Sequence, residues 1–228
     1  AFGHSLEKDA TEMVKANGGN VVGSVRHPLN ASDFSSFIMQ AQASKAQVIG
    51  MANATQDAVN TIKASREFGI VDKGQKLAAL MLQVTDVHAM GLQVAQGLVS
   101  SEGFYWDLDD QTRAFSARFE KVHKVKPNQV HAGVYSSVLH YLKSVAAAKS
   151  DAAPAVAAKM RELPIKDDVM RNASIRPDGR VVHDMLLVEV KKPAQSKAAW
   201  DYYNILGTIP ANTAFTPLAQ SQCSLVKK

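Results

Sequence analysis

The chain has 228 residues, 46% of them hydrophobic, which is enough to bury the core of one large domain or two small ones. It contains no run of about 18 apolar residues, so a membrane-spanning helix is excluded. The net charge is +5, but Lys and Arg are spread along the chain and no basic stretch is interleaved with aromatic residues. Composition therefore argues against a nucleic-acid partner.

The chain opens inside a structural unit. Ala1–Ser5 leads directly into a helix that carries Leu6, Ala10, Met13 and Val14 on one face. In an α/β sheet the segment between a strand and its following helix contacts ligands. We therefore predict that Ala1–Ser5 is such a loop and that its preceding strand belongs to a segment absent from this chain.

Strands and helices then alternate. Ser32-Asp33 is a capping sequence for a helix that starts near Phe34. The apolar run Val48–Met51 that follows this helix is typical of a strand buried on both faces. A helix is expected from Thr55 to Phe68, where Gly69 ends it. Strands are predicted near residues 20–26, 47–51, 76–82 and 97–101. This order predicts an α/β fold with a doubly wound parallel sheet.

The second half is mainly helical. Asp109 is expected to cap one helix, a long helix with valines every three or four residues follows, and Asp151–Leu163 is a third. These helices have no strands of their own to cover. The Arg176–Arg180 segment, with its Pro-Asp-Gly sequence, predicts a turn before a strand at Met185–Val190. The tail from Ala194 shows little periodicity.

Sites for chemistry are not evident in the sequence. Seven histidines form no H-x-x-x-H pair, and Cys223 has no second cysteine for a metal or a disulfide. Neither a nucleophile elbow nor a glycine-rich phosphate loop occurs. We therefore predict no catalytic residue, no metal ligand and no cofactor, and hence a protein that is not an enzyme.

Three strand-to-helix loops converge at one edge of the predicted sheet, where open α/β sheets bind ligands. They are Ala1–Ser5, Ala52–Thr55 and Leu80–Thr85. Ordinary connections between strands and helices are the alternative for each loop taken alone. The candidate ligand-binding residues in these loops are Phe2, Gly3, Ala52, Asn53, Ala54, Thr55, Met81, Leu82 and Gln83.

A family resemblance rests on several short motifs in a fixed order. They are Phe2-Gly3, Asp33–Phe37, Val48–Gly50, Glu67–Ile70, Gln96–Leu98, Tyr135–Ser137 and Ile175–Asp184. Together they resemble the solute-binding proteins of branched-chain-amino-acid-type ABC transporters, which have the type I periplasmic binding fold. The resemblance covers nearly the whole chain.

That resemblance implies two lobes with a ligand between them. Residues 1–104 would be the lobe-two α/β domain, 105–180 the helical part of lobe one, and 181–228 the return strand and tail. Crossovers would lie near Ser101–Tyr105 and Gly179–Val181, which adds Tyr105 to the ligand-binding candidates. The sheet of lobe one would lie in the missing N-terminal segment, so apolar side chains of two helices would be exposed, at Phe115/Phe119 and Val134/Val138.

The implied function is that of a periplasmic receptor, which binds a small-molecule solute and delivers it to an ABC permease in the membrane. The alternative is a cytosolic ligand-sensing regulatory domain of the same fold. Amino-acid receptors of this family place a carboxylate in the loop after the third strand, but Leu80–Gln83 contains no acid, and Asp86 is interpreted as a helix N-cap. We therefore expect an organic acid, an amide or an aromatic compound as ligand, rather than leucine.

Overall fold

The computed structural model describes residues 1–226, and the chain divides into two compact units. Unit 1 comprises Ala1–Ser101 and Val188–Ile205, and unit 2 comprises Glu102–Leu187 and the chain from Leu206 onward. The chain passes between the units after Ser101, after Leu187 and after Ile205. The three-part division at 104 and 180 stays a prediction.

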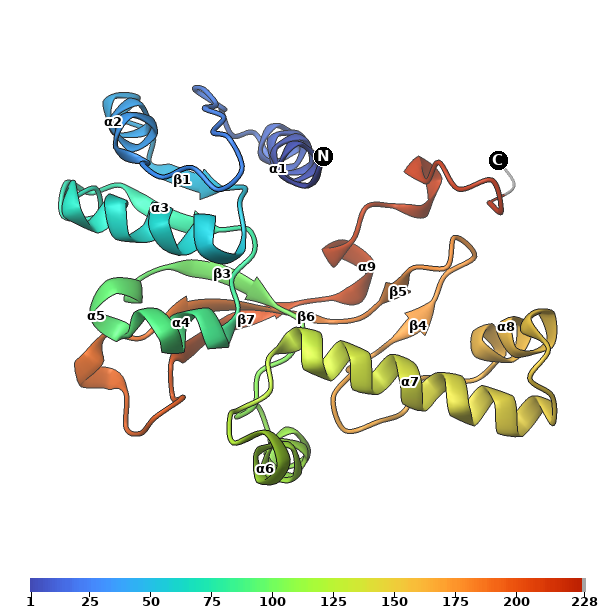
Figure 1. Ribbon diagram of the computed structural model, residues 1–228. Coiled ribbons are helices and arrows are strands. Elements are labelled where there is room, and N and C mark those ends of the chain that lie inside the picture. The colour runs from blue at the N-terminus through green and yellow to red at the C-terminus, as the bar shows by residue number, and fades with distance from the viewer. Residues whose placement is uncertain (227–228) are drawn as a thin grey trace. The chain divides into compact units, whose positions relative to one another are not determined.

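A five-stranded sheet in the order β1-β2-β3-β6-β7 is the main sheet of the structure (Figure 1). Its strands are β1 Val48–Met51, β2 Lys76–Ala79, β3 Val99–Glu102, β6 Met185–Val190 and β7 Tyr203–Ile209. The first three are parallel, with Val48 opposite Lys76 and Ala78 opposite Val99. The late strand β6 lies beside β3, so the predicted return of Met185–Val190 to this sheet is confirmed.

The helices of unit 1 alternate with these strands as expected for a doubly wound fold (Figure 1). They are α1 Phe2–Ala16, α2 Ser35–Ala43, α3 Thr55–Glu67, α4 Val84–Met90 and α5 Leu92–Ala95, with a 3-10 turn η1 at Pro193–Gln195. The core of the unit is made by fully buried aliphatic side chains of the helices, strands and loops: Ile62, Ile70, Leu77, Leu82, Leu98, Val188 and Val190. Burying one such side chain stabilises the fold by about 1.5–3 kcal/mol.

Two expectations about strands in unit 1 are wrong: one predicted strand does not form, and another forms but is less buried than expected. Val21–Val25 is not a strand, because no strand among residues 1–226 forms a hydrogen-bonded ladder with it. The strand β1 is buried on one face only, since Val48 is 51% exposed and Gly50 is also exposed while Met51 is buried. A strand at the edge of a sheet, with one face uncovered, does not need the continuous burial that its sequence suggested.

Element boundaries also differ from the sequence prediction. Helix α1 begins at Phe2, so only Ala1 of the expected Ala1–Ser5 loop lies outside it. Strand β2 ends at Ala79 and not at Leu82. Helix α2 begins at Ser35, and the Asp33 carboxylate accepts hydrogen bonds from the backbone N–H and hydroxyl of that residue at 2.9 and 2.6 Å. Asp33 therefore stabilises the helix start from just before it.

Unit 2 is built mainly from helices and a small hairpin, together with the start of β6 and the end of β7. Its elements are α6 Asp110–His123, α7 Gln129–Ala148, α8 Ala153–Glu162, β4 Ser174–Ile175, β5 Val181–Val182, α9 Ala211–Ala214 and η2 Leu218–Gln220. Asp109 caps α6 as predicted, accepting from the Thr112 N–H at 2.9 Å. The antiparallel pair β4–β5 encloses the predicted turn, where Gly179 has φ of 81°.

The core of unit 2 corrects one expectation about its helices. Phe115 is 5% exposed and Phe119 is half-buried, because both pack with Phe104, Ala132 and other residues in one cluster. The aromatic face of α6 is thus covered within the unit. On α7, by contrast, Val134 and Val138 are 59% and 52% exposed, as predicted.

Two further observations concern membrane-spanning helices and metal-binding groups in the described part of the chain. Within residues 1–226, no helix is both long and apolar enough to cross a membrane. The same part of the chain holds no group of three or more His, Cys, Asp or Glu side chains that could bind a metal ion.

Strand β7 was not predicted from the sequence, because it lies in the tail that showed little periodicity.

Candidate ligand-binding site

The carboxyl ends of two neighbouring strands define the candidate site in unit 1. Because β1 and β2 are parallel and adjacent, the loops that follow them emerge at the same edge of the sheet. The backbone N–H of Leu80 donates to the carbonyl of Met51 at 3.1 Å, which joins the two strands where they end. The predicted loops Ala52–Thr55 and Leu80–Gln83 therefore start side by side.

The start of helix α1 lies against the same edge. A β-carbon placed on Gly3 would be 2.8 Å from the carbonyl oxygen of Ala52, so the two backbones are in direct contact. Only glycine allows this approach, because any larger residue would need the Ala52 loop to move. Phe2, the next residue toward the N-terminus, is 53% exposed. The structure thus brings together the three segments that the sequence singled out.

Helix N-termini supply partial positive charge at this edge. Helices α1 and α3 start at Phe2 and Thr55, and neither N-cap residue, Ala1 or Ala54, has a side chain that accepts from the first turn. Such a helix start has backbone N–H groups available to an anion, and the helix dipole favours negative charge there. The helix that follows β2, α4, differs because Asp86 accepts from the Gln83 N–H at 2.9 Å.

Thr55 adopts a backbone conformation that is rare for its residue type. Its φ is 54°, in the left-handed region, although threonine is β-branched. A non-glycine residue in this region costs about 1–2 kcal/mol, so the rest of the fold must hold it there. Strained residues of this kind cluster at ligand clamps and active sites. Thr55 is also exposed, at the first residue of α3.

The remaining candidates differ in what they present to a ligand. Met81 and Gln83 are half-buried beside β2, whereas Leu82 is fully buried. Leu82 is therefore a core residue, and its side chain is not a contact surface for a ligand as proposed from the sequence. Tyr105 belongs to unit 2, where its 3% exposed side chain lies 6.0 Å from the ring of Trp106.

Asn53 is engaged in a hydrogen-bond network that the sequence did not reveal. Its amide nitrogen donates to Nε2 of His27 at 3.1 Å and to the hydroxyl of Thr61 at 2.8 Å. Asp57, 5% exposed, accepts from the backbone N–H of Asn30 at 3.1 Å. The network links the chain around residues 27–30 to the β1–α3 loop. No sequence motif could have identified His27, because 26 residues separate it from Asn53.

The acidic side chains nearest these loops are committed to backbone groups. Asp57 accepts from Asn30, and Asp86 accepts from Gln83. Burial raises the pKa of Asp86, although its hydrogen bond with the Gln83 N–H acts in the opposite direction. The sequence placed Asp86 at the N-cap; it is instead the third residue of α4, where its carboxylate accepts from the N-cap residue Gln83. Neither carboxylate is arranged as a counter-charge for a ligand ammonium group.

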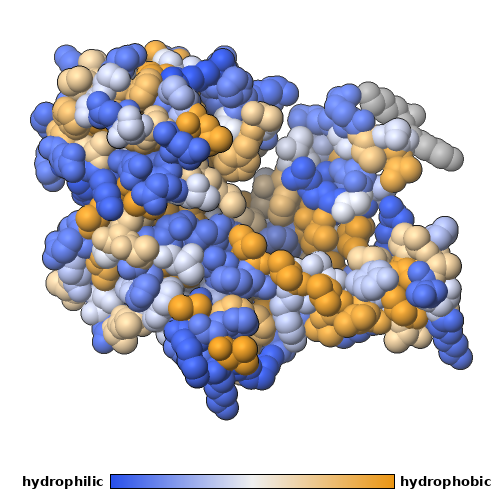
Figure 2. All heavy atoms as spheres, viewed as in Figure 1, coloured by the Kyte–Doolittle hydropathy of each residue, from blue (hydrophilic) through white to orange (hydrophobic). Residues whose placement is uncertain are grey.

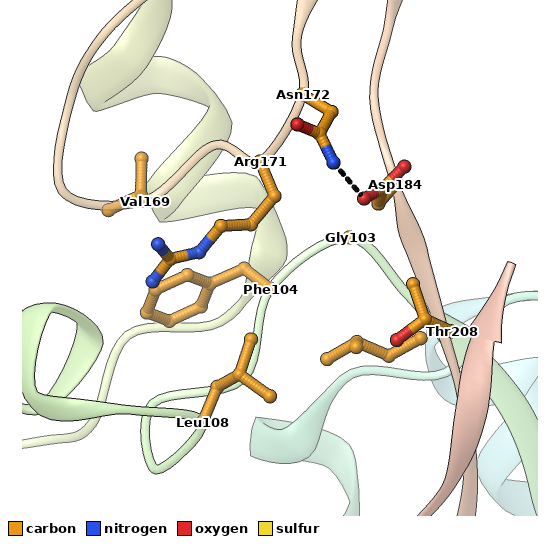
Figure 3. Close-up of a pocket in the computed structure, with 9 residues that line it drawn as sticks. Gly103, Phe104, Leu108, Val169, Arg171, Asn172, Asp184 and Thr208 are labelled. Carbon is orange, nitrogen blue, oxygen red and sulfur yellow. Dashed lines mark hydrogen bonds between the residues drawn. The ribbon is translucent and has the colours of Figure 1, made fainter. Parts of the chain in front are cut away.

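Unit 2 contains a hollow that is poorly suited to a ligand (Figure 3). Its volume is about 180 Å³, below the 300–1,000 Å³ that is usual for ligand pockets. The guanidinium of Arg171 pairs with Asp109 and donates to Gln111 at 2.9 Å. The amide of Asn172 donates to Asp184 at 2.5 Å. The polar groups here therefore satisfy one another.

Comparison with known proteins decides the family. A model of the periplasmic binding protein family matches residues 1–197. The chain belongs to this family. No curated protein matches the chain significantly.

Solved structures of periplasmic binding proteins extend the comparison. A periplasmic binding protein from Burkholderia mallei is 50% identical, with a TM-score of 0.93 over 100% of this chain. A branched-chain amino acid ABC transporter periplasmic ligand-binding protein from Burkholderia xenovorans is 41% identical, with a TM-score of 0.90 over 99% of this chain. This periplasmic binding protein chain spans 60% of the length of each. The type I periplasmic binding fold and the branched-chain-amino-acid-type family predicted from the sequence are thereby confirmed.

More distant structures share the fold. A solute-binding protein of an ABC transporter from Rhodopseudomonas palustris, in complex with p-hydroxybenzoic acid, is 22% identical. Its TM-score is 0.77 over 90% of this chain and 56% of its own. The family consists of solute-binding proteins, which are transport components and not enzymes.

Proposed function

We propose that this chain is part of a periplasmic receptor that binds a small organic solute and delivers it to the membrane permease of an ABC importer. Family membership and the 41% identical relative, which is named as a component of such a transporter, support this role. The observation that carries the proposal is the convergence of Phe2-Gly3, Ala52–Thr55 and Leu80–Gln83 at one sheet edge. Open α/β sheets bind their ligands at such edges.

The solute we propose is an aromatic or aliphatic carboxylate. The uncapped starts of α1 and α3 favour an anion, whereas Asp57 and Asp86 are committed to backbone N–H groups. A buried ammonium group without a counter-charge would be destabilised by several kcal/mol. Phe2 and Met81 offer apolar surface for the body of the ligand. The p-hydroxybenzoic acid complex of a protein with the same fold is consistent with this class.

Calorimetry on the full-length gene product tests both proposals. We expect binding of benzoate-type and short aliphatic carboxylates, much weaker binding of the matching neutral amides, and little binding of leucine or valine. Micromolar binding of leucine that is abolished by Asp86→Asn would overturn the ligand class while preserving the receptor role. Absence of binding to every compound in the panel would overturn the receptor role itself.

A matched pair of variants tests the site. Phe2 and Met13 lie on the same helix and are 53% and 55% exposed. We expect Phe2→Ala to weaken carboxylate binding about tenfold or more, because a buried aromatic contact is lost. Met13→Ala should leave affinity unchanged. Equal effects of the two substitutions would show that the ligand does not bind at the start of α1.

We also propose that further polypeptide of the same protein covers helix α7. An apolar stripe runs along this helix, and Figure 2 shows hydrophobic surface over it. It consists of Val130, Val134, Val138, Tyr141 and Leu142, each at least 44% exposed. Apolar patches of this kind on a folded protein mark contact surfaces. In each of the two most similar structures described above, about 40% of the length lies outside the match, which is enough chain to supply such a cover.

Charge substitution on α7 tests this cover. Val134→Glu combined with Val138→Glu should destabilise the full-length protein by several kcal/mol, because two carboxylates would be buried in an apolar contact. Leu29→Glu, at a residue 84% exposed outside the stripe, is the control. Unchanged urea unfolding of the α7 variant would show that the stripe is solvent-exposed in the complete protein.

A further inference from the structure

The ring of His27 is held by two hydrogen bonds that together specify its protonation. Nδ1 lies 2.8 Å from the carbonyl oxygen of Pro28, and Nε2 lies 3.1 Å from the amide nitrogen of Asn53. A carbonyl oxygen can only accept, so Nδ1 must carry a proton. The amide nitrogen can only donate, so Nε2 must accept with a free lone pair. Both conditions are met only by the neutral, Nδ1-protonated ring.

The orientation of the Asn53 amide follows from Thr61. The Thr61 hydroxyl donates its only hydrogen to the backbone carbonyl of Asp57 at 2.7 Å, and so it acts as the acceptor for Asn53 at 2.8 Å. Asn53 therefore directs its NH2 group toward Thr61, and the second hydrogen of that group meets His27. The other amide atom, Oδ1, is buried and has no hydrogen-bond partner within residues 1–226. Rotating the amide would move the NH2 group into that position, where it has no acceptor.

The surroundings of the His27 ring come from three elements and the adjacent chain. Phe34 and Phe37 on the α2 side pack against the ring, with centroids 4.8 and 5.9 Å away. From α3 the charged group is Asp57, whose carboxylate is engaged by the Asn30 N–H. The neighbouring Arg26 pairs with Glu7 of α1 at 2.9 Å. On the α2 side, the carboxylate of Asp33 is engaged with Ser35.

We infer that His27 is a positioning residue for the ligand-binding loop Ala52–Thr55 and that it holds this loop only while its ring is neutral. The inference rests on the proposed function of that loop. If Nε2 were protonated, it and the NH2 group of Asn53 would both be donors, so the hydrogen bond between them would be lost. The ring or the amide must then move, and the loop that contains Ala52, beside Gly3, loses its support. Ligand affinity should therefore be lower at acidic pH, because a proton on Nε2 would break the hydrogen bond with Asn53.

The experiment measures the affinity of the full-length protein for p-hydroxybenzoate, or for the tightest carboxylate of the panel, at pH 8.0 and 5.5. For the natural sequence we expect the dissociation constant to rise roughly tenfold at the lower pH, which corresponds to about one lost hydrogen bond. His27→Gln offers a side-chain oxygen that accepts from Asn53 at any pH. It should bind nearly as well at pH 8.0 and lose most of the pH dependence.

Two controls separate this inference from other causes. His123→Gln changes an exposed histidine of α6 in unit 2 and should keep the full pH dependence. Nitrogen-15 NMR of the unliganded protein at pH 8.0 should show the His27 ring protonated at Nδ1 and not at Nε2. An Nε2-protonated ring at pH 8.0, or a pH dependence that survives in His27→Gln, would overturn the inference. If no carboxylate binds at either pH, the proposed ligand class has failed, while the NMR result still tests the geometry of His27.

Discussion

Gly3 and Ala52 are in backbone contact although 48 residues of chain lie between them: a β-carbon on Gly3 would sit 2.8 Å from the Ala52 carbonyl oxygen. This contact joins the first turn of α1 to the loop that follows β1. It also makes the position of one segment depend on the other, because neither backbone can shift alone. The affinity for a ligand that contacts either segment should therefore depend on the position of both.

The Gly3 contact predicts an unequal effect of two glycine substitutions. Gly3→Ala should destabilise the protein by about 1–3 kcal/mol, as overpacking does elsewhere, and should weaken ligand binding because the Ala52 loop must move. Gly23 has open space around it and no left-handed φ, so Gly23→Ala should be neutral or slightly stabilising. Urea unfolding of both variants is the measurement. Equal stability of the two would show that the contact is absent.

Replacing Thr55 by glycine should stabilise the protein. The left-handed φ of 54° is unfavourable for threonine, and glycine adopts it freely. We expect a gain of up to about 1 kcal/mol, after allowance for the greater freedom of glycine in the unfolded chain. Gln56→Gly, one residue later in α3, should instead lose about 1 kcal/mol as glycine does within helices. A loss of stability in Thr55→Gly would contradict the strained geometry.

Asp86 should shape the pH dependence of stability. Its pKa is raised by burial above the ordinary 3.8, so its contribution to stability is fully present below that value and is lost as the pH rises through the folded-state pKa. Asp86→Asn keeps an oxygen that accepts from the Gln83 N–H but carries no charge. The stability of this variant relative to the natural sequence should therefore increase from pH 3.5 to 7. A constant difference over that range would argue against a raised pKa.

The hairpin of unit 2 should weaken in acid. The Arg176 guanidinium, 2.5 Å from the Asp178 carboxylate, lowers the pKa of that carboxyl to about 2. Its contribution to stability is present above the ordinary 3.8 and is lost as the pH falls toward 2. Hydrogen exchange of the Arg176 amide, which donates to the Arg180 carbonyl, reports this. Protection should drop between pH 4 and 2 in the natural sequence, and Asp178→Asn should show reduced protection with no such drop.

Much of the fold could be predicted because local patterns and tertiary structure agree. Strand β1 is a short apolar run, β2 carries Leu-Ala-Ala and β3 begins at Val99, all at regular spacing along the chain, and Asp109 precedes α6 with the expected capping chemistry. Val21–Val25 shows where this fails. It has strand propensity, but a strand also requires a partner with free N–H and C=O groups, which the sequence of the segment does not specify. Strand β7 shows the opposite case. Its sequence has little alternation of apolar and polar residues, so no strand was predicted, but it forms one because it pairs with β6.

The candidate site was predictable in outline but not in detail. The rule that ligand loops follow parallel strands selects the loops after β1 and β2, which the structure places side by side, and their role in ligand binding stays a prediction. It could not indicate which side chains turn inward. Leu82 fills the core and Asn53 bonds His27 because of packing between residues distant in sequence. The expectation about Phe115 was wrong in the same way, since Tyr135 and Phe104 cover it.

The open edge of β1 has a consequence for handling this chain in the laboratory. The strand reads Val-Ile-Gly-Met and carries no charge, and among the described strands it pairs only with β2. Natural proteins protect such edges with charged residues, proline or a covering segment. An uncharged apolar edge with free backbone donors and acceptors can template the addition of strands from other molecules, which is the first step toward cross-β fibres. Overexpression of these 228 residues by themselves should therefore yield thioflavin-positive aggregates, and a lysine at position 48 should suppress them.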